Sequence, residues 1–115
     1  MEVKLSEGQK TILYVLKHFS GIVMSWGVSK VLKIKVGHWD GIRLHVQGFV
    51  HEGAVNILYN EGTDLFDIQF IDLNEKIVKT IEDVYIDQLI EILDTNIEKC
   101  PNYENFVKQY YNLND

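Results

Sequence analysis

The stretch from residue 55 to residue 70 constrains the fold most, because polar and apolar side chains alternate in it twice. Its apolar positions are Val55, Ile57 and Tyr59 before a turn, and Phe66, Ile68 and Phe70 after it. A period of two is typical of strands that place one face against a core. The turn at residues 60–64 contains Asn60 and Gly62, which tolerate the positive φ of tight reversals. The stretch is therefore predicted to be a β-hairpin around which a sheet is built.

The size and composition of the chain predict one globular domain. Its 115 residues can bury a single core, and hydrophobic and charged fractions of 46% and 24% are ordinary for globular proteins. No apolar run reaches the roughly 18 residues that cross a bilayer, so no membrane segment is expected. The first residues lack the pattern of a signal peptide. Cys100 is the only cysteine, so we expect no disulfide, no disulfide-linked partner and a reducing, cytoplasmic location.

The formal net charge of −6 arises in the last third of the chain. Residues 1–71 carry seven basic and seven acidic side chains, whereas residues 72–115 carry four and ten. Lys30, Lys33, Lys35 and Arg43 form a locally basic segment that only Asp40 interrupts. General nucleic-acid binders are usually basic overall, so nucleic acid is disfavoured as a partner.

Helical signatures lie at the two ends of the sequence. Ser6 and Gln9 have the spacing of a capping box, and the apolar spacing that follows predicts a helix over residues 7–19. A second amphipathic helix is predicted from Asp83, its expected N-cap, through Ile97. Pro101 should end it and begin a short final helix. The apolar and aromatic stripe of that helix, expected to cover the sheet or to meet a second copy, is Tyr103, Phe106, Val107, Tyr110 and Tyr111.

Between these helices the sequence alternates with period two. The side chains expected to point inward are Ile22, Met24 and Trp26, then Leu32, Ile34 and Val36, and, after a loop at residues 37–41, Ile42, Leu44 and Val46. Those expected to point outward are Lys33, Lys35, Arg43, His45 and Gln47. A last strand is predicted at residues 76–81. Because short connections make consecutive strands antiparallel neighbours, we expect an α+β fold: an antiparallel five- to six-stranded meander with an N-terminal helix and two C-terminal helices packed on one face.

Three short strings carry a resemblance to a group of known proteins. They are Met-Ser-Trp-Gly at residues 24–27, Leu-Phe-Asp-Ile-Gln-Phe at residues 65–70 and Val-Tyr-Ile-Asp-Gln-Leu at residues 84–89. With the order helix, meander, helix, helix, they resemble small uncharacterised helix-meander-helix proteins encoded by bacteriophages and other mobile elements of bacteria. Trp26 and Gly27 replace small residues of that pattern. The resemblance implies a genomic setting and a fold, and it assigns no site residue.

Two groups of polar side chains are candidate binding sites. The first group consists of cationic and aromatic side chains on the polar sheet face, and we hypothesise that it binds an anionic ligand or a single nucleic-acid strand. Its members are Lys33, Lys35, Trp39, Arg43 and His45. The second group is an acidic stripe on the second helix, and we hypothesise that it binds a protein partner or a second copy of the chain. Its members are Asp87, Glu91, Asp94 and Glu98. The alternative for both groups is an ordinary solvated surface.

The sequence contains no recognisable catalytic, metal or cofactor motif. His38, His45 and His51 are spread along one predicted strand and its turns, too far apart for one metal ion. The turn at residues 60–64 lacks the ligand spacing of a calcium loop, and nothing marks Cys100 as an activated nucleophile. We therefore expect no cofactor, no bound metal and no assignable enzymatic activity.

The leading functional interpretation is a small non-catalytic accessory or protein-interaction protein. One alternative is a module that binds an anionic ligand or single-stranded nucleic acid through the polar sheet face. Another is a hydrolase whose carboxylates, Asp67 with Glu61 and Asp64 for example, converge only in the fold.

Overall fold

A computed structural model describes residues 4–98 of the chain. The helical elements are α1 (Glu7–His18), α2 (Ser20–Met24), a 3₁₀ turn η1 (Ile86–Gln88) and α3 (Leu89–Ile97). The strands are β1 (Lys30–Val36), β2 (Trp39–Gln47), β3 (Glu52–Asn60), β4 (Leu65–Ile71) and β5 (Ile77–Val84). The strands pair antiparallel in the order β1-β2-β3-β4-β5, which confirms the predicted α+β meander. Cys100, Pro101 and the final helix predicted after them lie outside the described residues.

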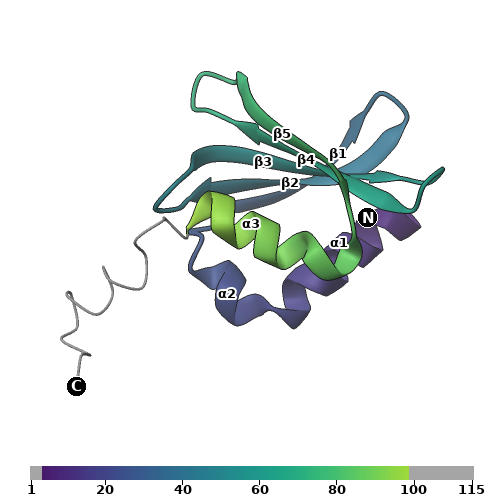
Figure 1. Ribbon diagram of the computed structural model, residues 1–115, viewed down its shortest axis with the longest axis horizontal. Helices are drawn as coiled ribbons and strands as arrows, with labels where there is room; N and C mark the ends of the chain where they lie inside the picture. The colour runs from purple at the N-terminus through teal and green to yellow at the C-terminus, as the bar shows by residue number, and fades with distance from the viewer. Residues whose placement is uncertain (1–3, 99–115) are drawn as a thin grey trace.

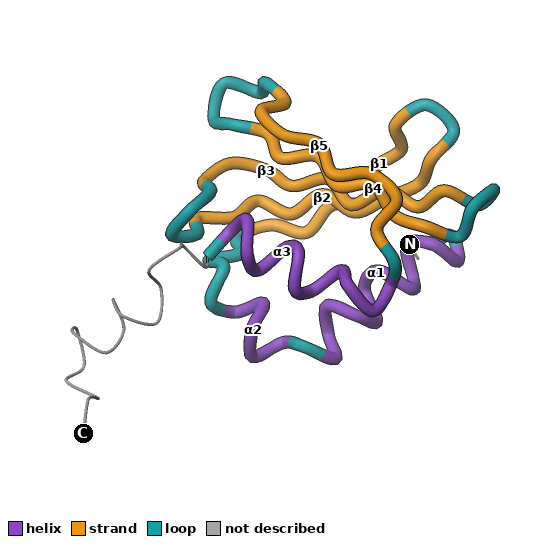
Figure 2. Tube along the Cα trace, viewed as in Figure 1, coloured by secondary structure: helices purple, strands orange, loops and turns teal. Residues whose placement is uncertain are grey.

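The described part of the molecule has two layers, a sheet and the helices that cover one face of it. Figures 1 and 2 show α1, α2 and α3 on the same side of the sheet. The β1–β2 and β4–β5 turns rise away from these helices, on the other side (Figure 1). One face of the sheet is thus covered by helices, and we call the opposite one the open face.

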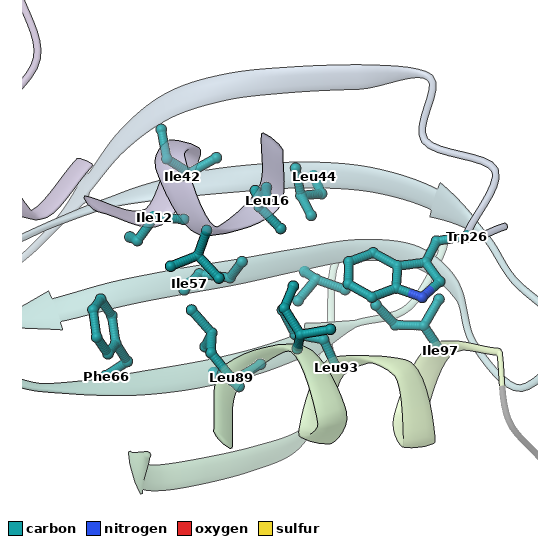
Figure 3. Packing of buried hydrophobic residues seen from close by; sticks show 14 of the residues in the cluster. Ile12, Leu16, Trp26, Ile42, Leu44, Ile57, Phe66, Leu89, Leu93 and Ile97 are labelled. Atoms are coloured by element: carbon teal, nitrogen blue, oxygen red, sulfur yellow. The ribbon is translucent and has the colours of Figure 1, made fainter. Parts of the chain in front are cut away.

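The apolar core lies between the helices and the covered face. Figure 3 shows its side chains from α1, the central strands and α3 gathered in one layer. The fully buried members include Ile12, Trp26, Ile42, Leu44, Ile57, Ile68, Leu89, Leu93 and Ile97. Ile57 of β3 and Ile68 of β4 are paired at its centre, so the hairpin predicted at residues 55–70 is confirmed.

Gln9 connects the start of α1 to the sheet. The capping box is confirmed, because the Gln9 amide donates to Ser6 Oγ at 3.2 Å and the Ser6 amide donates to Gln9 Oε1 at 2.9 Å. Gln9 Nε2 also donates to the carbonyls of Ile34 at 3.2 Å and Gly41 at 3.1 Å, which belong to paired residues of β1 and β2. A capping residue would be expected to be solvated, but Gln9 is buried and fixes α1 over the first hairpin.

The strand predicted around Ile22, Met24 and Trp26 is wrong, because residues 20–24 form the helix α2. Ile22 and Met24 are exposed on it, and only Trp26, just after it, is buried. Three alternate apolar residues are too few to distinguish a strand from one helical turn and a loop. The sheet therefore begins at Lys30 and has five strands.

The side-chain directions predicted for β1 are also wrong. Val36 pairs directly with Trp39 across a two-residue turn, whereas the expected five-residue loop would have paired it with Ile42. Gly37, at φ +62°, supplies the positive φ of this tight turn. Because the side-chain period is two, the change in loop length moves every β1 side chain to the other face. The predicted directions on β2 are confirmed, with Ile42, Leu44 and Val46 buried.

The helix predicted from Asp83 begins later, at Leu89. Asp83 lies in β5 with φ +56°, and its amide donates to Asp67 Oδ1 at 3.1 Å, so it is not the N-cap. The strand that was predicted to end at Ile81 extends to Val84. The apolar face of α3 is confirmed at Leu89, Ile90, Leu93 and Ile97, whereas Ile86 lies in η1 and is exposed.

Candidate functional site

A row of side chains crosses the open face from one edge of the sheet to the other. Successive registers pair, in order, Leu32, Arg43, Asn56, Gln69 and Thr80. Paired residues of antiparallel strands project on the same face. The row therefore belongs to the face that the helices leave uncovered, and its middle is polar.

Hydrogen bonds join the middle of this row. Arg43 Nε donates to Asn56 Oδ1 at 2.8 Å, and Asn56 Nδ2 donates to Gln69 Oε1 at 3.1 Å. Asn56 is only 3% exposed, so these bonds replace the water that its amide loses on folding. A slip of one residue in either register would leave this amide buried without partners, so the row fixes the register of the three central strands.

The β4–β5 turn leans over the open face and contacts the same row. Arg43 Nη1 donates to Glu75 Oε2 at 3.3 Å, a contact that reaches from β2 past β3 to the far turn. Both side chains are partly exposed, and such ion pairs contribute about 0–1 kcal/mol to stability. The main effect of the pair is thus geometric, because it holds Glu75 at the open face and gives the Arg43 charge a partner.

A cavity of about 240 Å³ lies at the end of the open face beside this ion pair. Its walls come from the segment before β1, the end of β2, the start of β3 and the β4–β5 turn. The polar side chains that line it are Ser29, His45, Gln47, Glu52, Asp72 and Glu75. Three of the six are carboxylates, so the cavity favours a cationic group over an anion.

The polar groups of the cavity are not equally free to bind. Asp72 Oδ1 accepts from the amides of Asn74 at 2.8 Å and Lys76 at 3.0 Å, which shapes the turn. Glu75 is engaged by Arg43. Within residues 4–98, the side chains of His45 and Glu52 make no hydrogen bond or ion pair. Within the same described residues the side chains of Ser29 and Gln47 are also without such a contact, so Glu52 is the lining carboxylate, and His45, Ser29 and Gln47 are the other polar groups, that a ligand can engage without breaking an existing contact.

The residues of the predicted anionic-ligand site lie on both faces of the sheet. Trp39, Arg43 and His45 belong to the open face, whereas Lys33 and Lys35 pair with Ile42 and Asp40 and project toward the helix side. Lys33 Nζ there donates to the carbonyl oxygen of Lys4. The five side chains are thus not brought together, and whether any of them binds an anion stays a prediction.

The predicted acidic stripe is partly used inside the molecule. Asp94 accepts the indole N–H of Trp26 at 2.9 Å, and Glu98 accepts the amide of Phe49 at 2.9 Å. Asp87 and Glu91 are exposed, with Asp87 in η1 rather than in the helix. A partner role for the stripe stays a prediction, in which Asp87 and Glu91 are its accessible members.

The remaining candidates from the sequence make hydrogen bonds or close polar contacts within the fold. His51 Nε2 lies 3.2 Å from the Ala54 carbonyl, and Asp67 accepts the Asp83 amide. In the β3–β4 turn the Tyr59 hydroxyl donates to Asp64, and this hydrogen bond, with burial and the negative charges nearby, raises the pKa of Tyr59. Across residues 4–98, no three His, Cys, Asp or Glu side chains are arranged to hold a metal ion.

Glu52, Asp72 and Glu75 were missed as site residues. The spacing of Asp72 and Asn74 before Lys76 does indicate a turn capped by a carboxylate. The spacing does not indicate the face of the sheet over which the turn leans. Glu75 reaches Arg43 only because the turn leans over the open face.

Comparisons with protein-family models, with curated proteins and with solved structures found no match to this chain. Among its described residues, none of the helices combines the length and the apolar character that a bilayer crossing requires. Fold and site together define a small α+β domain with one sheet face covered by helices and one open face that ends in an acidic cavity.

Proposed function

We propose that this chain is a small non-catalytic interaction protein that holds an extended segment of a protein partner against the open face of its sheet. A basic side chain of that segment occupies the cavity beside Arg43 and Glu75. The observation that carries the proposal is an open face with a cavity in which Glu52 and His45 have no partner in the described part of the chain.

The size of the cavity favours a side chain over a free ligand. Pockets for drug-sized molecules and cofactors are usually about 300–1,000 Å³, and this one has about 240 Å³. One long side chain fills such a space, while the backbone of the segment lies across the open face. A Lys or Arg side chain would find the Glu52 carboxylate as a charged acceptor.

A hydrolase is the second candidate, because three carboxylate side chains, Glu52, Asp72 and Glu75, line the same cavity. Acid–base catalysis needs two groups that can exchange protons with a substrate. Asp72 already accepts two amides of its turn, and Glu75 is held by Arg43. These contacts favour binding over catalysis.

The proposal includes the kind of genome that encodes the protein and the compartment in which it acts. The short strings at residues 24–27, 65–70 and 84–89 support an accessory role in a phage or mobile-element genome. The single cysteine supports a reducing compartment, the cytoplasm.

The proposal is tested by NMR titration of the ¹⁵N-labelled protein with the peptide Ac-Thr-Val-Arg-Val-Thr-NH₂ and with the same peptide carrying Glu for Arg. We expect the Arg peptide to shift the amide signals of Ser29, His45 and Gly53, and the Glu peptide to leave them in place. Glu52→Gln should weaken binding about tenfold, the usual size of one charge-assisted hydrogen bond.

Glu82→Gln is the matched control, because Glu82 is an exposed carboxylate on β5 and does not line the cavity. It should leave the affinity within about twofold of the original, since a distant exposed charge is largely screened. Equal shifts from both peptides, or equal affinity for the Glu52→Gln variant and the unsubstituted protein, would contradict the proposal.

The anionic-ligand alternative makes a different prediction. It requires retention on heparin at low salt, and loss of that retention in a Lys35→Gln, Arg43→Gln variant. If the unsubstituted protein passes through the column without delay, the anionic-ligand alternative is wrong.

A further inference from the structure

The charges of the molecule are separated along its sheet. Residues 4–47 carry seven basic and two acidic side chains, whereas residues 48–98 carry two basic and twelve acidic ones. In a meander, order along the chain is order across the sheet. The β1 side is therefore basic and the side of β5 and α3 is acidic, with β1 and β5 at opposite ends of the strand order.

The basic edge is a regular strand that no described residue pairs with on its outer side. All seven residues of β1 are in continuous register with β2. Three of them are lysines, Lys30, Lys33 and Lys35, and none is acidic. Val31, Leu32 and Val36 are 41–51% exposed. An edge of this kind offers backbone donors and acceptors to another extended chain.

The opposite edge is less suited to pairing. The register between β4 and β5 shifts twice, between Phe66 and Ile68 and between Phe70 and Ile71. Asp83, with φ +56°, lies at the first of these irregularities. Bulges twist an edge and interrupt its ladder, so β1 is the better template of the two.

The lysines of β1 select the kind of strand that can join it. Pairing β1 with β1 of a second copy would bring lysines close to lysines, which is destabilising. Pairing it with β5 of a second copy would require the bulged edge. Edge lysines commonly keep strands apart, but the same charges attract a strand that carries Glu or Asp. The favoured occupant is therefore an acidic extended segment from a different protein.

We propose that the outer edge of β1 binds an extended acidic segment of a partner protein by strand addition, so that the segment becomes a sixth strand of the sheet. Backbone hydrogen bonds supply affinity, and Lys33 and Lys35 supply charge selectivity. This site goes beyond the proposed function, because it is a different surface of opposite charge and does not involve the cavity.

The probe is the peptide Ac-Thr-Glu-Val-Glu-Val-Glu-Thr-NH₂, followed by NMR and by amide hydrogen exchange. We expect alternate amides of β1 to exchange at least about tenfold more slowly when the peptide is bound, since those that face outward become hydrogen-bonded. A peptide with N-methyl groups at alternate positions should bind at least about tenfold more weakly, because it cannot form the ladder.

Two charge-reversed variants separate the edge from the net charge of the protein. Lys33→Glu with Lys35→Glu should abolish binding of the acidic peptide. Lys10→Glu with Lys17→Glu on α1 changes the net charge equally and should keep most of the affinity. Glu52→Gln should have no effect, so failure of this inference is distinct from failure of the proposed function.

Equal losses in the two lysine variants, undiminished binding of the N-methylated peptide, or unchanged exchange at β1 would each overturn the inference. Tighter binding of oligothymidylate than of the acidic peptide would also overturn it, because the basic edge would then select phosphates rather than a peptide strand.

Discussion

Trp26 joins the first third of the chain to its last described helix. The side chain is 0% exposed, and its indole N–H donates to Asp94 at 2.9 Å. The substitution Trp26→Phe removes this hydrogen bond and part of the ring volume, and it leaves Asp94 without its donor. The free energy of unfolding, measured by urea denaturation, should fall by about 2–4 kcal/mol.

Trp39 provides the control for this substitution. It is only half-buried and lies in the outer hairpin, so Trp39→Phe should cost less than about 1 kcal/mol. Equal losses for the two tryptophans would show that Trp26 is not part of the core.

The Tyr59 hydroxyl should make stability depend on pH in the alkaline range. Its hydrogen bond to Asp64, then its burial and the charges of Asp64 and Glu61, raise its pKa above the ordinary 10.0. Because the folded-state pKa is raised, the contribution of the Tyr59 hydroxyl to the free energy of unfolding is complete below pH 10.0. This contribution is lost as the pH rises through the folded-state pKa.

The substitution Tyr59→Phe tests this dependence, because it keeps the ring against Phe66 and removes the titrating group. At pH 7 it should cost about 0.5–1.5 kcal/mol through the lost hydrogen bond. Urea denaturation between about pH 7 and pH 11 should show that this difference from the unsubstituted protein shrinks above pH 10.0. A difference that stays constant over this range would contradict the assignment.

At the scale of elements, the β2–β3 loop caps the C-terminus of α3. The Ile97 carbonyl accepts the amides of Val50 at 2.8 Å and His51 at 3.1 Å. A Cβ on Gly48 would lie 2.2 Å from that carbonyl oxygen, so Gly48→Ala should push the loop and the helix apart. Thermal denaturation should show a loss of more than about 1 kcal/mol.

Gly21 is the matched control, because a Cβ there meets nothing within 4 Å and the residue is helical. Gly21→Ala should leave stability unchanged or raise it by up to about 1 kcal/mol. If both variants lose the same stability, the contact between the loop and α3 is not the reason why position 48 requires glycine.

The elements that were predicted correctly have signals within a few residues. Ser6 and Gln9 mark the start of α1, and the alternation at residues 55–70 marks the central hairpin. The errors arise where the local pattern fits two structures. Residues 37–41 can form a five-residue loop or contain a two-residue turn, and the turn length sets the face of Lys33. Three alternate apolar residues at positions 22–26 fit a strand or a helical turn, and the partner of Trp26, Asp94, is distant in the sequence.

At the scale of the molecule, the meander could be predicted because short connections leave consecutive strands no other neighbours. The cavity could not, since Glu52 and Glu75 are 23 positions apart and meet only after the β4–β5 turn leans over the open face. The charge separation follows from sequence and topology together. The basic and acidic halves become edges of a sheet only when the strand order is known.

The central claim is that the helices cover one face of the sheet and leave the other without helices, so that solvent and a partner reach its outer parts. The most direct test is NMR of the free protein with a soluble paramagnetic gadolinium chelate, which broadens the signals of methyl groups that solvent reaches. We predict strong broadening at Leu32 and Leu73, on the open side, and little at Ile57, Ile68 and Leu93, in the core. Protection of Leu32 and Leu73 comparable to that of the core methyls would contradict the claim.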